Sequence, residues 1–196
     1  MARPRKFDES SVLTAARDQF WKNGFAGTNM DAIAAATGLG KGSLYGAFGS
    51  KQELFHRVFD DYCAGIVDGT AQQLSGGDEH AFERLTAYFR GVAIGSAGPS
   101  RRGCLLAKGT AELAEHDPVV LTRSHQTLDE VQRFIAADIE ACQRHGDLAA
   151  NADAQQLAAL LLAVHRGIEA LGKAGSDEGA LLSIAETALA GLPRPE

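Results

Sequence analysis

A glycine-punctuated stretch at residues 28–51, TNMDAIAAATGLGKGSLYGAFGSK, constrains the fold of this chain more than any other segment. Met30 and Ile33 begin an apolar helix face that repeats every three or four residues. Gly38 should end that helix, because glycine reaches left-handed backbone angles without a Cβ penalty. A second short helix is expected from about residue 41 to Phe48. The stretch therefore predicts two compact helices joined by a tight turn, the sequence form of a helix-turn-helix.

Two capping boxes frame this pair of helices. Thr28 and Asp31 stand three residues apart, and so do Ser50 and Glu53. In a capping box a hydroxyl and a carboxylate satisfy backbone N–H groups that lack partners at the start of a helix. We therefore expect the first helix of the helix-turn-helix to begin at Thr28 and a further helix to begin at Ser50, directly after the helix-turn-helix.

The second short helix carries residues suited to contact with double-stranded DNA. Its outer face presents side chains that donate hydrogen bonds, together with glycines that let a backbone approach closely. The candidate DNA contacts are Thr28, Lys41, Gly42, Ser43, Tyr45 and Lys51. The same spacing also fits a glycine-rich helical hairpin with a solvated polar face.

A wider set of positions agrees with a known family. The matching residues are Thr28, Ile33, Ala34, Gly38, Leu39, Lys41-Gly42-Ser43-Leu44-Tyr45, Phe48, Ser50-Lys51 and Leu54, with Leu13, Ala16, Phe20 and Gly24-Phe25 upstream. On these residues the chain resembles the TetR family of bacterial transcriptional regulators over roughly its first third. The resemblance implies a homodimeric repressor that binds a palindromic operator and is released by a small-molecule or electrophile inducer. Ala47 departs from the pattern, because several members carry a histidine or another polar residue there.

The composition indicates an all-α protein, since alanine and leucine abound and alternating strand patterns are absent. The net charge is −6, yet residues 1–51 carry seven Lys and Arg against four Asp and Glu. A basic head on an acidic body is typical of a local DNA site rather than of a general polyanion binder. The basic arm at residues 1–7 is predicted either to add phosphate contacts or to be a frayed tail.

The expected architecture is a DNA-binding domain at residues 1–52 and a helical ligand-binding and dimerisation domain at residues 53–196. The expected longer helices cover about 8–23, 50–74, 79–96, 102–115 and 118–145, with two more to the C-terminus. The clearest breaks are Ser75–Asp78 and Gly98–Ser100, and Asp117-Pro118 is a strong helix start.

The chain is expected to reside in the cytoplasm and away from the membrane. Its N-terminus lacks an apolar leader, and no run of about 18 apolar residues is present. Three widely spaced cysteines fit reduced thiols rather than a disulfide framework.

The last two helices carry narrow apolar seams that suit helix bundles. The seam residues are Leu157, Leu161, Val164, Ile168 and Leu171 in the first, and Leu182, Ala185, Leu189 and Leu192 in the second. Such seams can pack within one chain or against a symmetry mate. The resemblance favours a homodimer through these two helices, which Leu161→Asp or Leu189→Asp would dissociate.

The resemblance also implies an apolar pocket among the middle helices for an inducer that the sequence does not identify. The candidate lining is Phe82, Tyr88, Phe89, Cys104, His125 and His165. Packing in the core is the competing interpretation, and it is the better one for Phe82 and Phe89. The six histidines lack metal-ligand spacing, so no metal is expected. The sequence has neither a phosphate-binding loop nor a serine nucleophile motif, so neither another cofactor nor a catalytic residue is expected.

Cys104 supports two interpretations. Arg101 and Arg102 just upstream, together with a helix N-terminus, favour a reactive thiolate. Alternatively, Cys104 fills space in a small-residue face with Ala107 and other alanines, and this packing interpretation is favoured. The rival function classes are a helical thiol- or flavin-dependent enzyme centred on Cys104, which would bind no operator, and a ligand-independent DNA-binding regulator.

Overall fold

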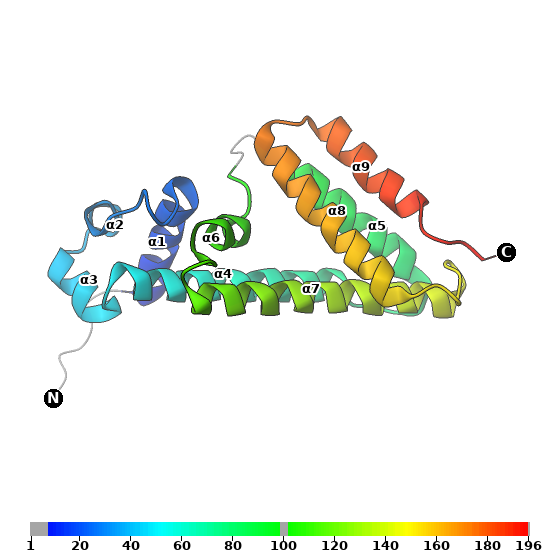
Figure 1. Ribbon diagram of the computed structural model, residues 1–196, viewed down its shortest axis with the longest axis horizontal. Coiled ribbons are helices and arrows are strands. Elements are labelled where there is room, and N and C mark those ends of the chain that lie inside the picture. Colours follow the sequence, from blue (N-terminus) through cyan, green and yellow to red (C-terminus); the bar gives the residue numbers. More distant parts are fainter. Residues whose placement is uncertain (1–7, 99–101, 196) are drawn as a thin grey trace. The chain divides into compact units, whose positions relative to one another are not determined.

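The computed structural model describes residues 8–98 and 102–195, and in this part of the chain every regular element is a helix (Figure 1). The all-α prediction is confirmed. The basic arm at residues 1–7, and Pro99 and Ser100 of the second predicted break, lie outside the described residues. The elements are α1 (Glu9–Asn23), α2 (Met30–Thr37), α3 (Lys41–Phe48), α4 (Lys51–Gln73), the 3₁₀ turn η1 (Asp78–His80), α5 (Ala81–Ser96), α6 (Leu105–Leu113), α7 (Pro118–His145), α8 (Ala154–Ala174) and α9 (Glu178–Ala190).

The first of two compact units comprises the described residues of 1–64 and 104–124. Its core is a cluster of aromatic rings in which Phe55 of α4 is central. The Phe55 ring lies 5.1 Å from that of Phe20, 5.2 Å from Phe25 and 5.4 Å from Phe59, between ring centroids. Helix α6 approaches α4 closely because a Cβ at Gly109 would lie 2.6 Å from the Phe59 ring. This unit is defined by packing, and it includes residues beyond 52. The predicted division of function between residues 1–52 and 53–196 therefore stays a prediction.

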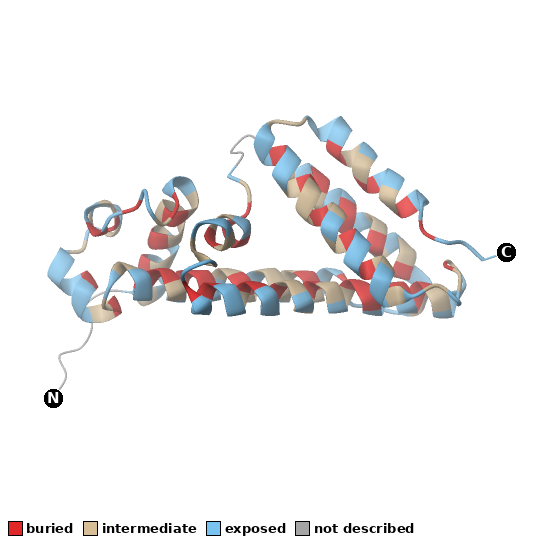
Figure 2. Cartoon of the chain, viewed as in Figure 1, coloured by how far each residue is buried: buried red, intermediate tan, exposed pale blue. Residues whose placement is uncertain are grey.

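The second compact unit comprises the described residues of 65–103 and 125–196. Helices α5, α8 and α9 lie side by side, and their facing sides carry the buried residues (Figures 1 and 2). Phe89, Leu161, Ile168 and Ala185 are fully buried in this core. Gly172 allows α8 to approach the end of α5, because a Cβ there would lie 2.5 Å from the carbonyl oxygen of Ser96.

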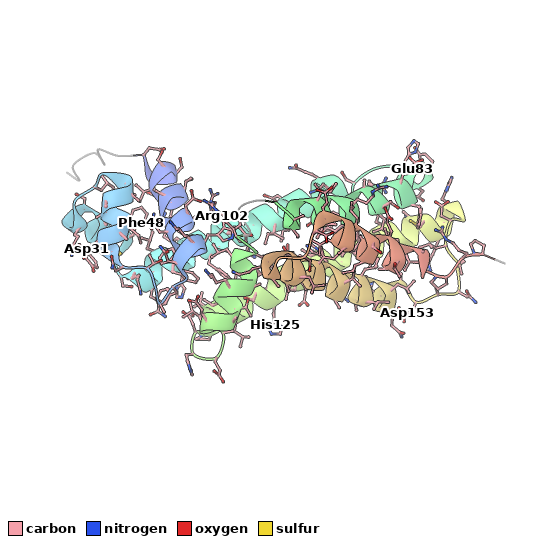
Figure 3. All side chains as sticks on the ribbon, turned by 90° about the horizontal axis from the view of Figure 1, so that it is seen from above. Asp31, Phe48, Glu83, Arg102, His125 and Asp153 are labelled. Atoms are coloured by element: carbon pink, nitrogen blue, oxygen red, sulfur yellow. The ribbon has the colours of Figure 1, made fainter. Side chains whose placement is uncertain are left out.

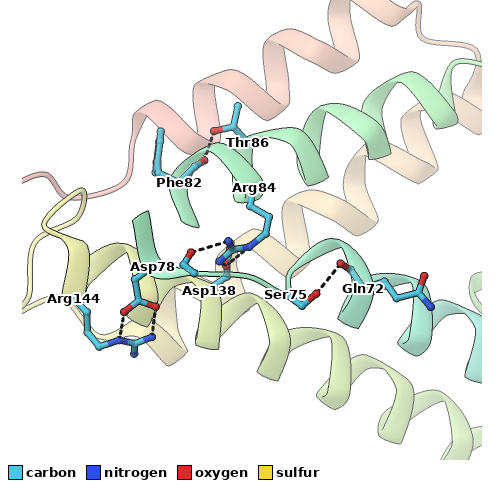
Figure 4. Close-up of polar contacts among 9 residues, drawn as sticks. Gln72, Ser75, Asp78, Phe82, Arg84, Thr86, Asp138 and Arg144 are labelled. Atoms are coloured by element: carbon cyan, nitrogen blue, oxygen red, sulfur yellow. Dashed lines mark hydrogen bonds and ion pairs between the residues drawn. The ribbon is translucent and has the colours of Figure 1, made fainter. Parts of the chain in front are cut away.

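Two ion pairs tie the turn between α4 and α5 to helix α7 (Figure 4). Nε of Arg84 donates to Oδ1 of the buried Asp138 at 3.0 Å, and a second guanidinium nitrogen of Arg84 donates to the Gly77 carbonyl at 2.9 Å. Arg144 binds both carboxylate oxygens of Asp78, at 2.7 and 3.0 Å. Bidentate arginine–carboxylate pairs hold a fixed geometry, so the predicted break at residues 75–78 is an anchored turn.

Several predicted helix ends are confirmed. Ser50 and Glu53 form the expected reciprocal capping box: the Ser50 N–H donates to Glu53 Oε2 at 2.7 Å, and the Glu53 N–H donates to Ser50 Oγ at 3.1 Å. Asp117 caps α7 by accepting from the N–H groups of Val119 and Val120, at 3.1 and 3.3 Å.

Two details of the predicted helices are wrong. Asn29, rather than Thr28, caps α2, because its side chain accepts from the Ala32 N–H at 2.8 Å. Helix α6 is shorter than the predicted 102–115 and begins at Leu105. Gly103 has a left-handed φ of +68° and Cys104 is extended, so neither residue continues a helix backward.

Candidate nucleic-acid interface

Helices α2 and α3 form the predicted helix-turn-helix. Gly38 ends α2 with a left-handed φ of 69°, and α3 begins three residues later. The inner faces of the two helices meet the core through Met30 and Ile33 of α2 and Leu44 and Phe48 of α3, all of which are buried. The apolar spacing in the sequence thus fixes which side of α3 remains open to solvent.

The open side of α3 presents hydrogen-bond donors alternating with small residues. Lys41, Ser43 and Tyr45 are exposed, and 51% of the Tyr45 side chain is accessible. A Cβ at Gly42 or Gly46 would meet no atom within 4 Å, so neither glycine is required by packing. This strip is free to approach another molecule along one side of a short helix.

Lys41 of α3 forms an ion pair with Asp31 of α2. Both side chains are more than half exposed, so the pair lies in solvent beside the open strip. Figure 3 labels Asp31 and Phe48, which mark α2 and the end of α3. An exposed ion pair of this kind contributes at most about 1 kcal/mol, so a phosphate or base edge can displace Asp31 from Lys41.

Two predicted contact residues have internal roles in this structure. Thr28 is 1% exposed, and its hydroxyl donates to the Gly24 carbonyl at 2.7 Å. Lys51 places its Nζ 3.0 Å from the carbonyl oxygens of Phe25 and Thr28, and 4.1 Å from the centre of the Phe25 ring. The Thr28 side chain thus faces inward and Lys51 holds the chain between α1 and α2, and DNA contacts by these two residues stay predictions.

Sequence reasoning missed Arg57, which packs against the end of α3. Its guanidinium lies 5.0 Å from the centre of the Phe48 ring and pairs with Glu9 at the start of α1. Arg57 thereby joins three helices of the first unit. Its position in the sequence, on the polar side of α4, gave no sign of these partners.

Among the predicted ligand contacts, the structure brings Tyr88, Phe89 and His165 together inside the second unit. The Tyr88 hydroxyl lies 3.3 Å from Nδ1 of His165 and 3.4 Å from the hydroxyl of Thr70. The three ring centroids lie 5.3 to 6.3 Å apart. All three side chains are at most 8% exposed, so they form a polar cluster within an apolar core.

The other three predicted ligand contacts do not join this cluster. Phe82 is half-buried, and the guanidinium of Arg194 lies 4.0 Å above its ring. His125 is exposed on α7 (Figure 3). Cys104 belongs to the first unit, is 6% exposed, and accepts a hydrogen bond from the Tyr62 hydroxyl at 3.6 Å.

Burial controls the charge of the polar cluster. It lowers the pKa of His165 to about 4, assisted by the nearby guanidinium of Arg166. Burial also raises the pKa of the Tyr88 hydroxyl. Both side chains are therefore neutral at pH 7 and can exchange hydrogen bonds without a buried charge.

Comparison with known proteins agrees with the geometry of both units. Residues 12–58 match the family of bacterial regulatory proteins of the tetR type, and residues 81–187 match the tetracyclin repressor-like C-terminal domain. The chain belongs to the TetR family. It is a DNA-binding transcriptional regulator.

Individual relatives cover nearly the whole chain. The HTH-type transcriptional repressor ComR of Escherichia coli K12 is 26% identical over 194 residues, which is 95% of this chain and 90% of ComR. A cysteine mutant of the TetR-family regulator CifR, solved with a 26-bp operator DNA, is 28% identical with a TM-score of 0.82. That match covers 98% of this chain and 100% of CifR.

Two further features of the described residues concern membranes and metals. No helix of the described part is long and apolar enough to cross a membrane. Within residues 8–98 and 102–195, no group of three or more His, Cys, Asp or Glu side chains is placed to hold a metal ion.

Proposed function

We propose that this TetR-family regulator is a repressor that inserts α3 into the major groove of a palindromic operator as a homodimer. The observation that carries the proposal is the exposed strip of α3, with Lys41, Gly42, Ser43 and Tyr45 on a helix whose other side is anchored in the core. Major-groove recognition needs a helix whose exposed side chains can hydrogen-bond to base edges and phosphates and whose backbone can approach the DNA. Because its target is chromosomal DNA, we expect the protein to act in the bacterial cytoplasm.

Base and phosphate contacts are divided along α3 in this proposal. Lys41→Ala should change sequence preference, with a cost of about 1–3 kcal/mol confined to the base pairs it reads. Tyr45→Phe should weaken binding to every sequence by a similar factor, because a phosphate contact carries no base information. Dissociation constants on a panel of single-base operator variants measure both. Identical profiles for the two variants would contradict this division.

The proposed dimer contact is the outward face of α8. Leu160 is 57% exposed and Leu171 is 42% exposed, and the small residues Ala163 and Gly167 lie between them on the same side. Small residues between exposed leucines let two helices approach closely. Of the seam predicted for α8, Leu161 and Ile168 are buried in the chain's own core, whereas Leu171 lies on this outward face, so the predicted contact through the last two helices stays a prediction.

For the inducer, we propose binding at the buried cluster of Tyr88, Phe89 and His165. A neutral imidazole and a phenol within an apolar wall suit an uncharged molecule that carries a polar group. A ligand that lowers operator affinity for the wild type, and loses that effect in Tyr88→Phe and His165→Leu, would support this site. A regulator whose DNA binding no small molecule alters is the ligand-independent alternative.

Both interpretations of Cys104, reactive thiolate and core packing, can be tested. It is 6% exposed between α4 and α6, where the Tyr62 hydroxyl donates to its Sγ and accepts from the Leu105 N–H at 3.3 Å. This environment favours packing. If Cys104 instead senses electrophiles, a quinone should release DNA from the wild type and not from Cys104→Ser, while Cys63→Ser and Cys142→Ser still respond. Equal release from wild type and Cys104→Ser, or none, leaves Cys104 as packing.

A further inference from the structure

The chain between α1 and α2, residues 24–29, is held by helix α6 as well as by Lys51. At one end, Nζ of Lys108 donates to the carbonyl oxygens of Trp21 and Lys22, at 3.0 and 3.2 Å. These carbonyls belong to the last turn of α1, and no following helical turn supplies N–H groups that could donate to them. A cation at a helix C-terminus also interacts favourably with the helix dipole.

One helical turn further along α6, Glu112 binds the other side of the same connection. Its Oε2 accepts from the N–H groups of Phe25 and Ala26, at 2.7 and 3.3 Å. Gly24 lies between the two anchoring points with a φ of 77°, and a Cβ at this position would collide with the Glu112 carboxylate. Lys108 thus binds carbonyl groups before Gly24, and Glu112 binds N–H groups after it. Only glycine fits at position 24, because any side chain there would collide with Glu112.

We propose that Lys108 and Glu112 are positioning residues for DNA binding. Helix α2 begins at Met30, directly after this connection, and α3 follows it, so the connection sets how the helix-turn-helix leaves α1. Hydrogen bonds to a charged partner are roughly twice as strong as neutral ones, and here each charged group binds two backbone groups. The inference rests on the proposed contact of α3 with DNA.

Because Glu112 is negatively charged, the direction in which its removal changes DNA affinity distinguishes positioning from a simple charge effect. DNA is a polyanion, so removal of a carboxylate from the DNA-binding unit should strengthen binding if charge alone matters. Positioning predicts the opposite, because loss of Glu112 frees the Phe25 and Ala26 amides and loosens the helix-turn-helix.

The experiment compares Glu112→Ala with Glu115→Ala in the full-length protein. Glu115 lies just beyond α6, and its carboxylate is 91% exposed. The Glu115→Ala variant therefore removes the same charge without removing a hydrogen bond to the backbone of residues 24–29. The probe is the best DNA fragment selected by the wild type, titrated at several salt concentrations. Amide hydrogen exchange at Phe25 and Ala26 reports whether the connection has loosened.

Glu112→Ala is expected to bind this fragment about tenfold more weakly, with faster exchange at both amides and an unchanged salt dependence. Glu112→Gln should fall between it and the wild type, because the amide oxygen still accepts hydrogen bonds. Glu115→Ala should bind as tightly as the wild type or tighter.

Unchanged or tighter DNA binding by Glu112→Ala would overturn the proposal, and so would unchanged exchange at Phe25 and Ala26. If Glu112→Ala fails to fold, Glu112→Gln decides by the same two measurements. A wild type that selects no DNA would count against the proposed function instead.

Discussion

Leu161→Asp should unfold the protein, whereas Leu160→Asp should leave it folded and separate its subunits. Leu161 is 0% exposed in the core shared by α5, α8 and α9, while its neighbour Leu160 is 57% exposed. A buried carboxylate without a partner, added to the loss of a leucine from a packed core, costs more than about 4 kcal/mol. That is a large part of the 5–15 kcal/mol that typically stabilises a domain.

The two variants form a matched pair, since each introduces the same charge in place of the same residue on the same helix. Circular dichroism measures folding, and light scattering after size exclusion measures the molar mass. A folded monomer from Leu161→Asp would show instead that Leu161 lies in the dimer contact. A Leu160→Asp protein that stays dimeric would move the interface away from this face of α8.

The protein should lose stability on acidification because His165 must be neutral in the folded state. Its pKa is lowered to about 4 by burial, against 6.5 for an ordinary histidine. Above pH 6.5 the imidazole is neutral in both the folded and unfolded states, so it contributes no pH dependence. Below pH 6.5 the unfolded chain binds a proton that the folded chain excludes, and stability falls until the pH reaches the folded pKa.

Between pH 7.5 and pH 5, this single group should lower the free energy of unfolding by about 2 kcal/mol. Urea unfolding at both pH values, at one protein concentration, measures the change. His165→Leu should lose about 2 kcal/mol less than the wild type over this interval. His125→Leu, which removes an exposed histidine, should behave like the wild type. Equal losses for wild type and His165→Leu would show that His165 carries a proton in the folded state.

The helix-turn-helix could be predicted because its signals are local. Gly38, the apolar spacing of α2 and the Ser50–Glu53 box each act over three or four residues, and the helix ends follow them. The error at the start of α2 has the same origin. Thr28 and Asn29 both suit an N-cap, and which of them takes that position depends on Thr28 turning inward to the Gly24 carbonyl.

The seam of α8 could be predicted from its helical spacing, but the spacing could not decide whether the seam packs within the chain or against a symmetry mate. Packing against α5 and α9 decides that Leu161 faces the chain's own core, while Leu160 faces outward. The roles of Lys108 and Glu112 were likewise beyond the sequence. Their partners are backbone atoms 86 or 87 residues away, and a backbone group leaves no trace in the residue types that surround it.

Selection of bound fragments from a pool of random double-stranded DNA tests directly whether α3 reads an operator as part of a two-fold symmetric dimer. The enriched sequences should share an inverted repeat, with half-site centres about 10 base pairs or a multiple of that distance apart. The same selection with the Lys41→Ala protein should enrich a repeat altered at the positions that Lys41 reads. A wild-type selection that enriches no sequence, or a single site without a repeat, would contradict this account.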